Sequence, residues 1–287
     1  MNFPRYWAKG SYTGTTCDGK KATCCAFGWS SESLTDAEAK GRQRAQLFVE
    51  KGIGSDKRKE YEYGEAPFRE EVIDSIQLDG NDVAIISRNR YGSLVLNSAN
   101  VMFVDIDLPR IVSTGFWDAV RLHFSSKKRK ERRQIVESIS LDLVQAWHQE
   151  NPTKSFRLYR THSGLRLLLT DKVYDPKGDE SKGILTDLDS DPLYRALTER
   201  QGCYRARLTP KPWRCRTPRP PSSFPWSDPE DEKKYRAWED TYSKASKQYA
   251  TCALIREYGS ETDDPVIRQV VACHDSFTIS AQSLPLA

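Results

Sequence analysis

The sequence predicts an α+β fold with a core between residues 101 and 210, and three features indicate it. The run Val101–Ile106 is apolar on both faces, as expected of a strand in the middle of a sheet. Pro109 ends this strand, and a helical stretch follows from about 115 to 149. A tight hairpin of two short strands comes after the helix.

The hairpin and the elements after it complete the predicted core. They are two strands, two helical segments and a last strand, at Ser155–Arg160, Leu165–Thr170, Lys182–Asp187, Pro192–Arg200 and Cys203–Leu208. Asp191 suits the N-cap of the second helical segment. The order strand, helix, strand, strand, helix, strand is that of the ferredoxin-like or RNA-recognition-motif (RRM) fold. We therefore expect an RRM-like core (βαββαβ) with an antiparallel sheet and both helices on one face.

Residues 1–100 are predicted to form an N-terminal α+β extension that packs on this core. Ser33 or Thr35 can cap a helix that ends near Val49. A short helix that begins after a proline is expected at Phe68–Ile76. The expected strands of the extension are Arg5–Ala8, Thr23–Trp29, Val83–Ser87 and Leu94–Asn97.

Residues 211–287 are expected to contain a proline-rich segment and C-terminal helices. Arg216–Pro225 has too many prolines for a helix or an inner strand, so it is expected to be extended. Asp228–Tyr258 is predicted to be one long charged helix, and Pro265–Cys273 a short one.

The composition is that of a folded, water-soluble chain of 287 residues, of which 38% are hydrophobic and 29% are charged. No apolar run is long enough to span a bilayer, and Met1–Trp7 lacks the features of a signal peptide. We therefore expect a cytoplasmic protein with no membrane partner. The 7 cysteines, an odd number, argue against a disulfide framework. A net charge of +4 permits a phosphate-bearing partner and does not require one.

The pair Asp105 and Asp107 is the most specific candidate site. Alternation along the strand places both side chains on one face, about 7 Å apart at their Cα atoms. Two carboxylates this close repel each other unless a cation lies between them, and Mg²⁺ and Mn²⁺ prefer oxygen ligands. The sequence therefore predicts a Mg²⁺ or Mn²⁺ site with these two aspartates as ligands. The alternative is that one aspartate caps the following turn and the other faces water.

A second candidate site is the hairpin turn. His162, Ser163 and the backbone amides near Gly164 can face a nucleotide phosphate, and the flanking Arg160 and Arg166 can assist. The alternative is an ordinary hairpin with glycine at its turn.

A third candidate is the basic strand and loop that end the core. Arg205 and Arg207 share one face of the last strand, and Lys211, Trp213 and Arg214 follow in a proline-bounded loop. Cations next to an aromatic ring are typical of phosphate contact combined with base stacking. The alternative is that the arginines pair with acidic residues and that Trp213 packs in the core.

Weaker candidates have no fixed role. A third metal-binding carboxylate is left open among Asp171, Asp187, Asp189 and Asp191. The basic cluster Lys127–Arg133 is typical of a solvated helix face. His274 and Asp275 can form a catalytic pair, although adjacent residues rarely point at each other.

These motifs resemble those of the archaeo-eukaryotic primase superfamily, which includes the primase-polymerases. Its members carry an Asp-x-Asp or Asp-x-Glu motif on a core strand, a Ser-x-His motif on a neighbouring strand, a third carboxylate and a basic strand and loop, on an RRM-like fold. Asp105 and Asp107 match the first motif, and Arg207 and Lys211 loosely match the basic loop. The second motif departs, because Arg166 stands near the position of the superfamily's histidine. The chain as a whole is also similar to a family of bacterial hypothetical proteins, a likeness that implies no function.

The resemblance implies a metal-dependent, nucleotidyltransferase-like protein that acts on nucleotides, DNA or RNA, with Asp105 and Asp107 as catalytic residues. A second hypothesis is a non-catalytic nucleic-acid or nucleotide binding module on the same fold, which the missing histidine suggests. A third is a phosphohydrolase of the haloacid dehalogenase type, which also has Asp-x-Asp at a strand end. That family needs a parallel sheet and usually has Thr or Val where this chain has Pro109, so it fits less well.

Overall fold

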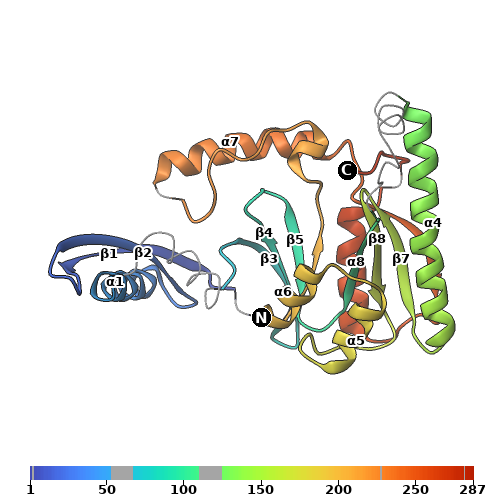
Figure 1. Ribbon diagram of the computed structural model, residues 1–287, viewed down its shortest axis with the longest axis horizontal. Coiled ribbons are helices and arrows are strands. Elements are labelled where there is room, and N and C mark those ends of the chain that lie inside the picture. Colours follow the sequence, from blue (N-terminus) through green and yellow to red (C-terminus); the bar gives the residue numbers. More distant parts are fainter. Residues whose placement is uncertain (2, 53–66, 110–124, 227, 281) are drawn as a thin grey trace. The chain divides into compact units, whose positions relative to one another are not determined.

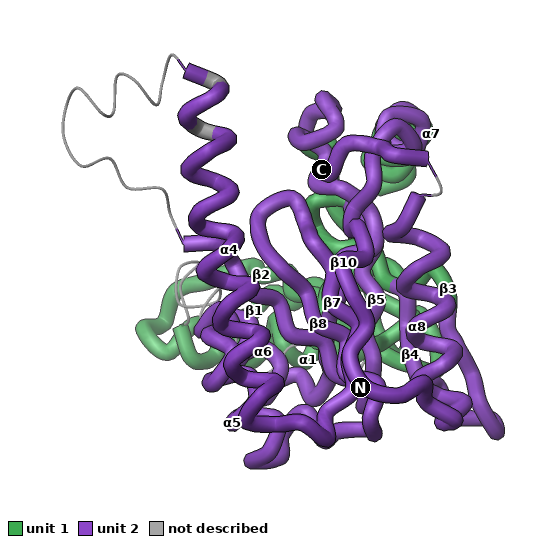
Figure 2. The backbone as a smooth tube through the Cα atoms, turned by 90° about the vertical axis from the view of Figure 1, so that its right-hand side faces the viewer, with its two compact units in different colours: residues 1–74, 87–92, 219–240 green, residues 75–86, 93–218, 241–287 purple. Residues whose placement is uncertain are grey.

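The computed structural model describes residues 1, 3–52, 67–109, 125–226, 228–280 and 282–287. The chain has the α+β architecture that the sequence predicts, and it divides into two compact units (Figures 1 and 2). Unit 1 comprises residues 1–74, 87–92 and 219–240, and unit 2 comprises residues 75–86, 93–218 and 241–287. Each unit thus combines segments that are far apart in the sequence. Among the described residues, no helix has both the length and the apolar character of a membrane span.

Unit 1 begins with a long β-hairpin and one helix. Strands β1 (Tyr6–Thr15) and β2 (Lys21–Ser30) pair antiparallel over their full length, so both extend beyond the predicted ranges. Helix α1 (Leu34–Glu50) follows. The Ser33 hydroxyl accepts a hydrogen bond from the Asp36 backbone amide, which confirms one of the two predicted caps.

Helix α1 lies directly on the hairpin because glycines remove side chains from the contact. A Cβ atom at Gly28 would lie 2.0 Å from the Ala37 carbonyl oxygen, and one at Gly10 would lie 1.9 Å from the Arg42 backbone nitrogen. On the helix side, a Cβ atom at Gly41 would lie 2.7 Å from the Gly10 nitrogen. Any side chain at these positions would push the helix away, so the packing of this part of unit 1 depends on the glycines.

The helix predicted at Phe68–Ile76 is wrong, because this segment contributes to strand β3 (Glu71–Leu78). Strand β3 neighbours β4 (Asn81–Arg88) in a sheet of order β3-β4-β5-β9. Asp79 and Gly80 join the two strands with positive φ angles of 50° and 78°, as a two-residue hairpin turn requires. The Asp-Gly turn therefore favours a hairpin, although Pro67 suggested the start of a helix.

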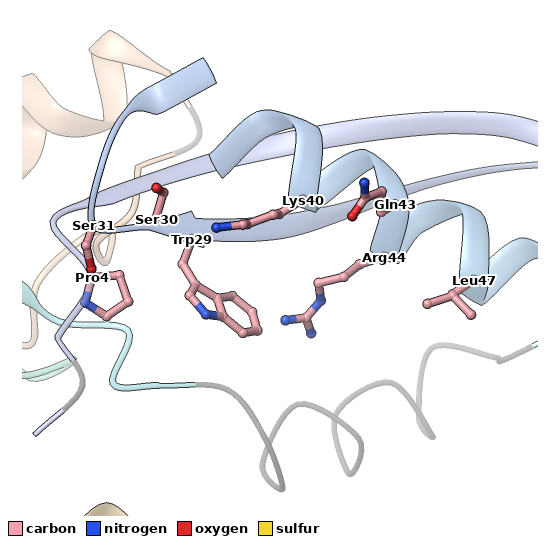
Figure 3. Close-up of a pocket in the computed structure, with 8 residues that line it drawn as sticks. All are labelled: Pro4, Trp29, Ser30, Ser31, Lys40, Gln43, Arg44 and Leu47. Carbon is pink, nitrogen blue, oxygen red and sulfur yellow. The ribbon is translucent and has the colours of Figure 1, made fainter. Parts of the chain in front are cut away.

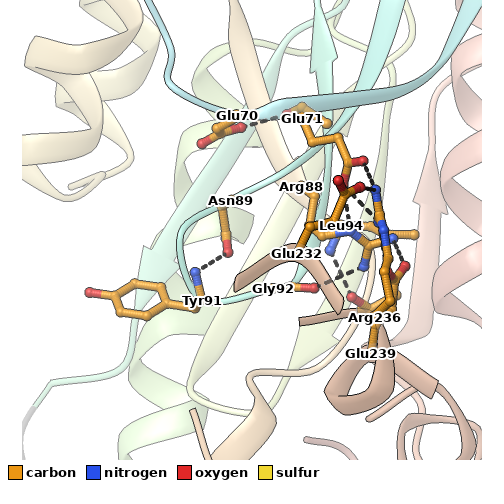
Figure 4. A network of polar contacts seen from close by, with 12 residues as sticks. Glu70, Glu71, Arg88, Asn89, Tyr91, Gly92, Leu94, Glu232, Arg236 and Glu239 are labelled. Atoms are coloured by element: carbon orange, nitrogen blue, oxygen red, sulfur yellow. Dashed lines mark hydrogen bonds and ion pairs between the residues drawn. The ribbon is translucent and has the colours of Figure 1, made fainter. Parts of the chain in front are cut away.

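A network of ion pairs joins distant segments of unit 1 (Figure 4). Arg88 pairs with Glu71 at 3.6 Å and also with Glu239, and Arg236 pairs with the same two carboxylates. Arg236 and Glu239 belong to α7 (Pro229–Ser246). Arg236 also pairs with Glu232 of its own helix at 3.3 Å. The network ties the part of α7 that belongs to unit 1 to the strand residues of unit 1.

Unit 2 contains an antiparallel sheet of order β10-β7-β8-β6. Its strands are β6 (Phe103–Asp107), β7 (Phe156–Thr161), β8 (Gly164–Leu169) and β10 (Cys252–Tyr258). All of β8 is buried, as are Phe103 and Val104 of β6. The apolar run of β6 therefore lies in the core, as the sequence predicts.

Strand β6 is nevertheless the last strand of its sheet and not a central one. Its outer backbone carbonyls are bonded by side chains instead of by another strand. The Tyr194 hydroxyl donates to the Phe103 carbonyl at 3.0 Å, and the Ser190 hydroxyl donates to the Asp105 carbonyl at 3.0 Å. These two bonds explain how a buried edge strand avoids unsatisfied polar groups.

The last predicted core strand, β9 (Tyr204–Arg207), pairs with β5 (Leu94–Ser98) in the other sheet. It does not pair with β6, as the RRM order would require. The chain order of the elements from β6 to β9 agrees with the prediction, but their pairing into one sheet does not.

Within the described residues, four α-helices lie wholly in unit 2. They are α4 (Ser126–Glu150), α5 (Asp179–Asp187), α6 (Pro192–Gln201) and α8 (Pro265–Thr278). Figure 1 shows α4 alongside β7, where Trp147 packs against Phe156 with ring centroids 5.8 Å apart. The Asp191 side chain caps α6, as predicted. The part of the predicted helix before residue 125 lies outside the described residues.

The long helix predicted at Asp228–Tyr258 is correct only in its first part, because α7 ends at Ser246 and the remainder includes β10. Strand β10 pairs with β7, which would otherwise be a bare edge of the sheet. Sequence pattern alone gave no sign of this long-range pairing. Helix α8, also longer than predicted, contributes the fully buried Ile267 and Val270 to the core.

Candidate phosphate-binding site

Asp105 is held by a buried arginine. Asp105 on β6 and Arg166 on β8 face each other in the sheet register. The guanidinium donates Nε to one carboxylate oxygen at 2.6 Å and Nη2 to the other at 2.9 Å. The Arg166 side chain is only 4% exposed, so its charge needs a partner, and Asp105 supplies it. Asp105 raises the pKa of Arg166 against the opposing effect of burial.

The third nitrogen of Arg166 reaches further into the core. Nη1 donates to the Arg207 carbonyl at 3.1 Å and lies 3.8 Å from the Cys252 sulfur and 3.4 Å from His274 Nε2. Since arginine can only donate, His274 Nε2 accepts and Nδ1 carries the proton. Burial lowers the pKa of His274, and burial raises the pKa of Cys252 to about 11, so both stay uncharged at neutral pH.

His274 and its neighbour do point at each other, against expectation. His274 Nδ1 lies 2.9 Å from Asp275 Oδ1, which also accepts a bond from the Tyr159 hydroxyl at 2.8 Å. Arg157 pairs with the other oxygen of Asp275 at 3.1 Å. Because both ring nitrogens of His274 are engaged and its side chain is fully buried, this pair supports Arg166 and does not face a ligand.

Asp107 differs from Asp105 in its exposure and in its bonding. It is exposed, and its carboxylate makes no hydrogen bond or ion pair within the described part of the chain. Partial burial and the negative charges of Asp105 and Asp191 raise the pKa of Asp107, while Lys211 and Arg214 oppose this rise. Of the four aspartates considered as a third carboxylate, Asp191 is the one whose charge raises the pKa of Asp107.

The two aspartates do not present a ready-made ligand pair for Mg²⁺ or Mn²⁺. Asp105 uses both oxygens to bind Arg166, which leaves Asp107 as the exposed carboxylate. Among the residues that the structure describes, no three His, Cys, Asp or Glu side chains are grouped so that they could hold a metal ion. The donor set as arranged therefore does not fit the predicted metal site.

A cluster of three cations lies beside Asp107. Lys211 and Arg214, at the short 3₁₀ helix η1 (Pro212–Cys215), act on the charge of Asp107, and Arg207, at the end of β9, acts on Lys211. The Arg207 guanidinium is partly buried and has no hydrogen bond or ion pair to any described residue. Burial and the charge of Arg166 lower the pKa of Arg207. Burial, Arg207 and Arg214 likewise lower the pKa of Lys211, so these cations repel one another.

The hairpin turn brings further polar groups to this cationic cluster. Ser163 accepts a hydrogen bond from Arg214 through its hydroxyl and one from the Leu108 amide, at 3.0 Å, through its carbonyl. The His162 carbonyl accepts a bond from Arg133 of α4. Burial, together with the charges of Arg214, Arg133 and Lys211, lowers the pKa of His162. Arg133 belongs to the basic cluster Lys127–Arg133, which the sequence analysis treated as typical of a solvated helix face, and this bond brings it to the site.

The remaining predicted residues have other positions. Arg160 pairs with Glu137 of α4 and is engaged there. Trp213 is 44% exposed, which contradicts the alternative that it packs in the core, and the Lys211 ammonium lies 5.7 Å from its ring centroid. Arg205 shares the partly exposed face of β9 with Arg207, as alternation predicts.

Gly164 permits the close approach of the turn to β6. A Cβ atom there would lie 2.0 Å from the Ile106 carbonyl oxygen. The glycine is therefore needed for the contact between the turn and β6, and not only for the conformation of the turn.

No protein-family model, curated protein or solved structure matches the chain.

Proposed function

We propose that the protein binds phosphate groups of nucleotides or nucleic acid at the cationic cluster of Arg207, Lys211 and Arg214. The observation that carries this proposal is an imbalance of charge. Two of the three cations, Lys211 and Arg214, act on the exposed carboxylate of Asp107, and within the described part of the chain none of the three forms an ion pair with it within 4 Å. A phosphate among them would supply the missing negative charge and accept charge-assisted hydrogen bonds.

The neighbouring groups suit this role. Ser163 holds Arg214 in place, and Trp213 offers an exposed aromatic ring on which a base can stack. Asp105 is committed to Arg166, so the cluster can bind a phosphate without a metal ion. Binding without catalysis is therefore the first choice among the hypotheses that the sequence leaves open.

Salt-dependent binding of a fluorescein-labelled single-stranded oligonucleotide, followed by anisotropy with ATP as competitor, tests the proposal. Lys211→Ala is expected to weaken binding and to reduce the slope of log K against log salt by about 1. Asp107→Asn is expected to tighten binding about fivefold, since a nearby negative charge costs a phosphate about 1 kcal/mol. Lys182→Ala is the matched control, because Lys182 on α5 pairs with Glu199 on α6. No binding at low salt, or equal effects of the two lysine variants, contradicts the proposal.

A second candidate function is metal-dependent nucleotidyl transfer, and Asp107 favours it. Its carboxylate is exposed and unbonded in the described part of the chain, and Asp191 is close enough to act on its charge. Extension of a labelled primer-template with nucleotides and Mn²⁺ tests this activity. Incorporation that disappears in Asp107→Asn supports it, and no incorporation by the wild type excludes it.

We also propose that the core is RRM-like and that the protein is distantly related to the primase-polymerases. The chain order from β6 to β9 and the Asp-x-Asp position support them, and the pairing of β9 with β5 counts against them. A haloacid-dehalogenase-type phosphohydrolase is not proposed. Its Asp-x-Asp strand needs parallel neighbours, whereas β6 pairs antiparallel with β8.

A further inference from the structure

The first half of α4 carries three lysines that form no ion pair within the described part of the chain. They are Lys127, Lys128 and Lys130, and all three are exposed. From Lys127 to Ile139 no described side chain of α4 is buried. Figures 1 and 2 show that the first turns of α4 extend past the turn between β7 and β8. This half of the helix is therefore open to a partner.

The charge pattern of this half is not the one that stabilises a helix. The first turn of α4 contains no acidic residue. A helix N-terminus carries a partial positive charge, so lysines placed there oppose the helix dipole. The stability of α4 thus does not account for these lysines, whereas an anionic partner would relieve their repulsion.

Arg133 joins α4 to the cationic cluster described above. It donates a hydrogen bond to the His162 carbonyl, and the next residue, Ser163, accepts a bond from Arg214. Burial and the charge of Arg133 lower the pKa of Arg214, so these two cations act on each other. The described contacts use one of the five N–H donors of the Arg133 guanidinium, which leaves the others for a ligand.

A row of cations follows one side of α4 to this point. Lys127, Lys130 and Arg133 are spaced three residues apart, so their side chains are neighbours on the helix surface. The rise of the helix separates Lys127 from Arg133 by about 9 Å along the axis. This length is more than one phosphate group can span, so the row and the cluster together suit a ligand with several phosphates.

We propose that a single strand of nucleic acid binds along α4, with one phosphate at the cationic cluster and the next ones at Arg133, Lys130 and Lys127. This inference rests on the proposed phosphate binding, and it names the ligand as a strand of several nucleotides. The phosphates of a strand repeat along its length, so a row of cations matches them. A free nucleotide at the cluster reaches only one end of the row.

Cations in the other unit are already engaged, and this contrast favours α4. Figure 3 shows a hollow in unit 1 whose lining includes Lys40 and Arg44. Lys40 pairs with Asp36 at 2.6 Å, and the Arg44 guanidinium lies 4.2 Å from the ring centroid of Trp29. A phosphate in the hollow would compete with these contacts, whereas one on the first half of α4 would not.

Anisotropy of fluorescein-labelled decathymidylate and calorimetric titration with ATP test the inference on the whole chain. Lys127→Ala/Lys130→Ala is expected to weaken decamer binding about fivefold and to reduce the slope of log K against log salt by about 1.4, because each contact to a single strand contributes about 0.7. The affinity for ATP should stay unchanged. Lys233→Ala/Lys234→Ala is the matched control, since these are exposed lysines of α7 that form no ion pair with a described residue.

Lys211→Ala separates this inference from the proposed function. If it weakens both ligands while the α4 variant weakens neither, the cluster binds phosphate and α4 is not part of the site. If neither ligand binds the wild type at low salt, the proposed phosphate binding fails together with the inference.

Three further outcomes overturn the inference alone. They are equal losses in the α4 and α7 variants, a loss of ATP binding as large as the loss of decamer binding in the α4 variant, and displacement of the decamer by an equal concentration of deca-glutamate. The last outcome would assign the row of cations to an acidic peptide.

Discussion

At the scale of single residues, the two aspartates of the Asp-x-Asp motif have different roles. Asp105 balances the buried charge of Arg166, whereas Asp107 is exposed among cations. Sequence alone treats them as equivalent, because alternation places both on one face of the strand. The difference comes from Arg166, which lies opposite Asp105 on a strand 61 residues away in sequence.

Asp105→Asn is therefore expected to destabilise the protein by about 2–3 kcal/mol, and Asp107→Asn by less than about 0.5 kcal/mol. The first value is below that of a fully buried pair because Asp105 is 37% exposed. Urea unfolding of the two variants measures both effects. The double variant Asp105→Asn/Arg166→Met should recover part of the loss, because it removes the uncompensated charge as well. Equal effects of the two single substitutions would contradict this assignment.

At the scale of elements, tight backbone contacts decide how α1 packs on its hairpin. Gly28→Ala would place a Cβ atom 2.0 Å from the Ala37 carbonyl oxygen, so the helix must shift. We expect a loss of about 2–3 kcal/mol of stability, as for overpacked cores. Gly183→Ala in α5 is the control, since its Cβ would meet nothing within 4 Å. It should stabilise the protein by about 0.5–1 kcal/mol through helix propensity, and urea unfolding again gives the comparison. A harmless Gly28→Ala would mean that the helix does not rest on the hairpin.

The elements that sequence predicted well are those with local signals. Ser33 and Asp191 cap their helices, and the apolar run of β6 is buried, as expected. Two of the wrong predictions, the helix over the segment of β10 and the central position of β6, concern segments whose structure depends on distant partners. Strand β10 forms because β7 offers it an edge, and the edge of β6 is satisfied by hydroxyl groups from Tyr194 and Ser190. No periodicity within these segments carries that information.

At the scale of the whole molecule, the candidate site could be predicted as a list of residues but not as an arrangement. The basic strand and loop, the hairpin turn and the Asp-x-Asp motif do meet in unit 2. The sequence did not show that Arg166 would balance the charge of Asp105, because this pairing depends on burial and on the contacts of Arg166 with His274 and Cys252. His274 was considered only as one half of a catalytic pair with Asp275, and Cys252 carried no motif, so nothing in the sequence connected either residue with Arg166.

The network behind Arg166 makes stability depend on pH. Burial lowers the pKa of His274 in the folded state, whereas in the unfolded state it returns to its ordinary value near 6.5. Below that value the unfolded chain binds a proton that the folded chain does not, so stability falls as pH falls. The His274 contribution has a slope of up to about 1.4 kcal/mol per pH unit until the folded pKa is reached. Urea unfolding between pH 7 and pH 5 measures the slope, and His274→Gln should make it shallower while leaving the other titrating groups in place. A His274→Gln variant with an unchanged slope would show that the imidazole is not the neutral acceptor for Arg166.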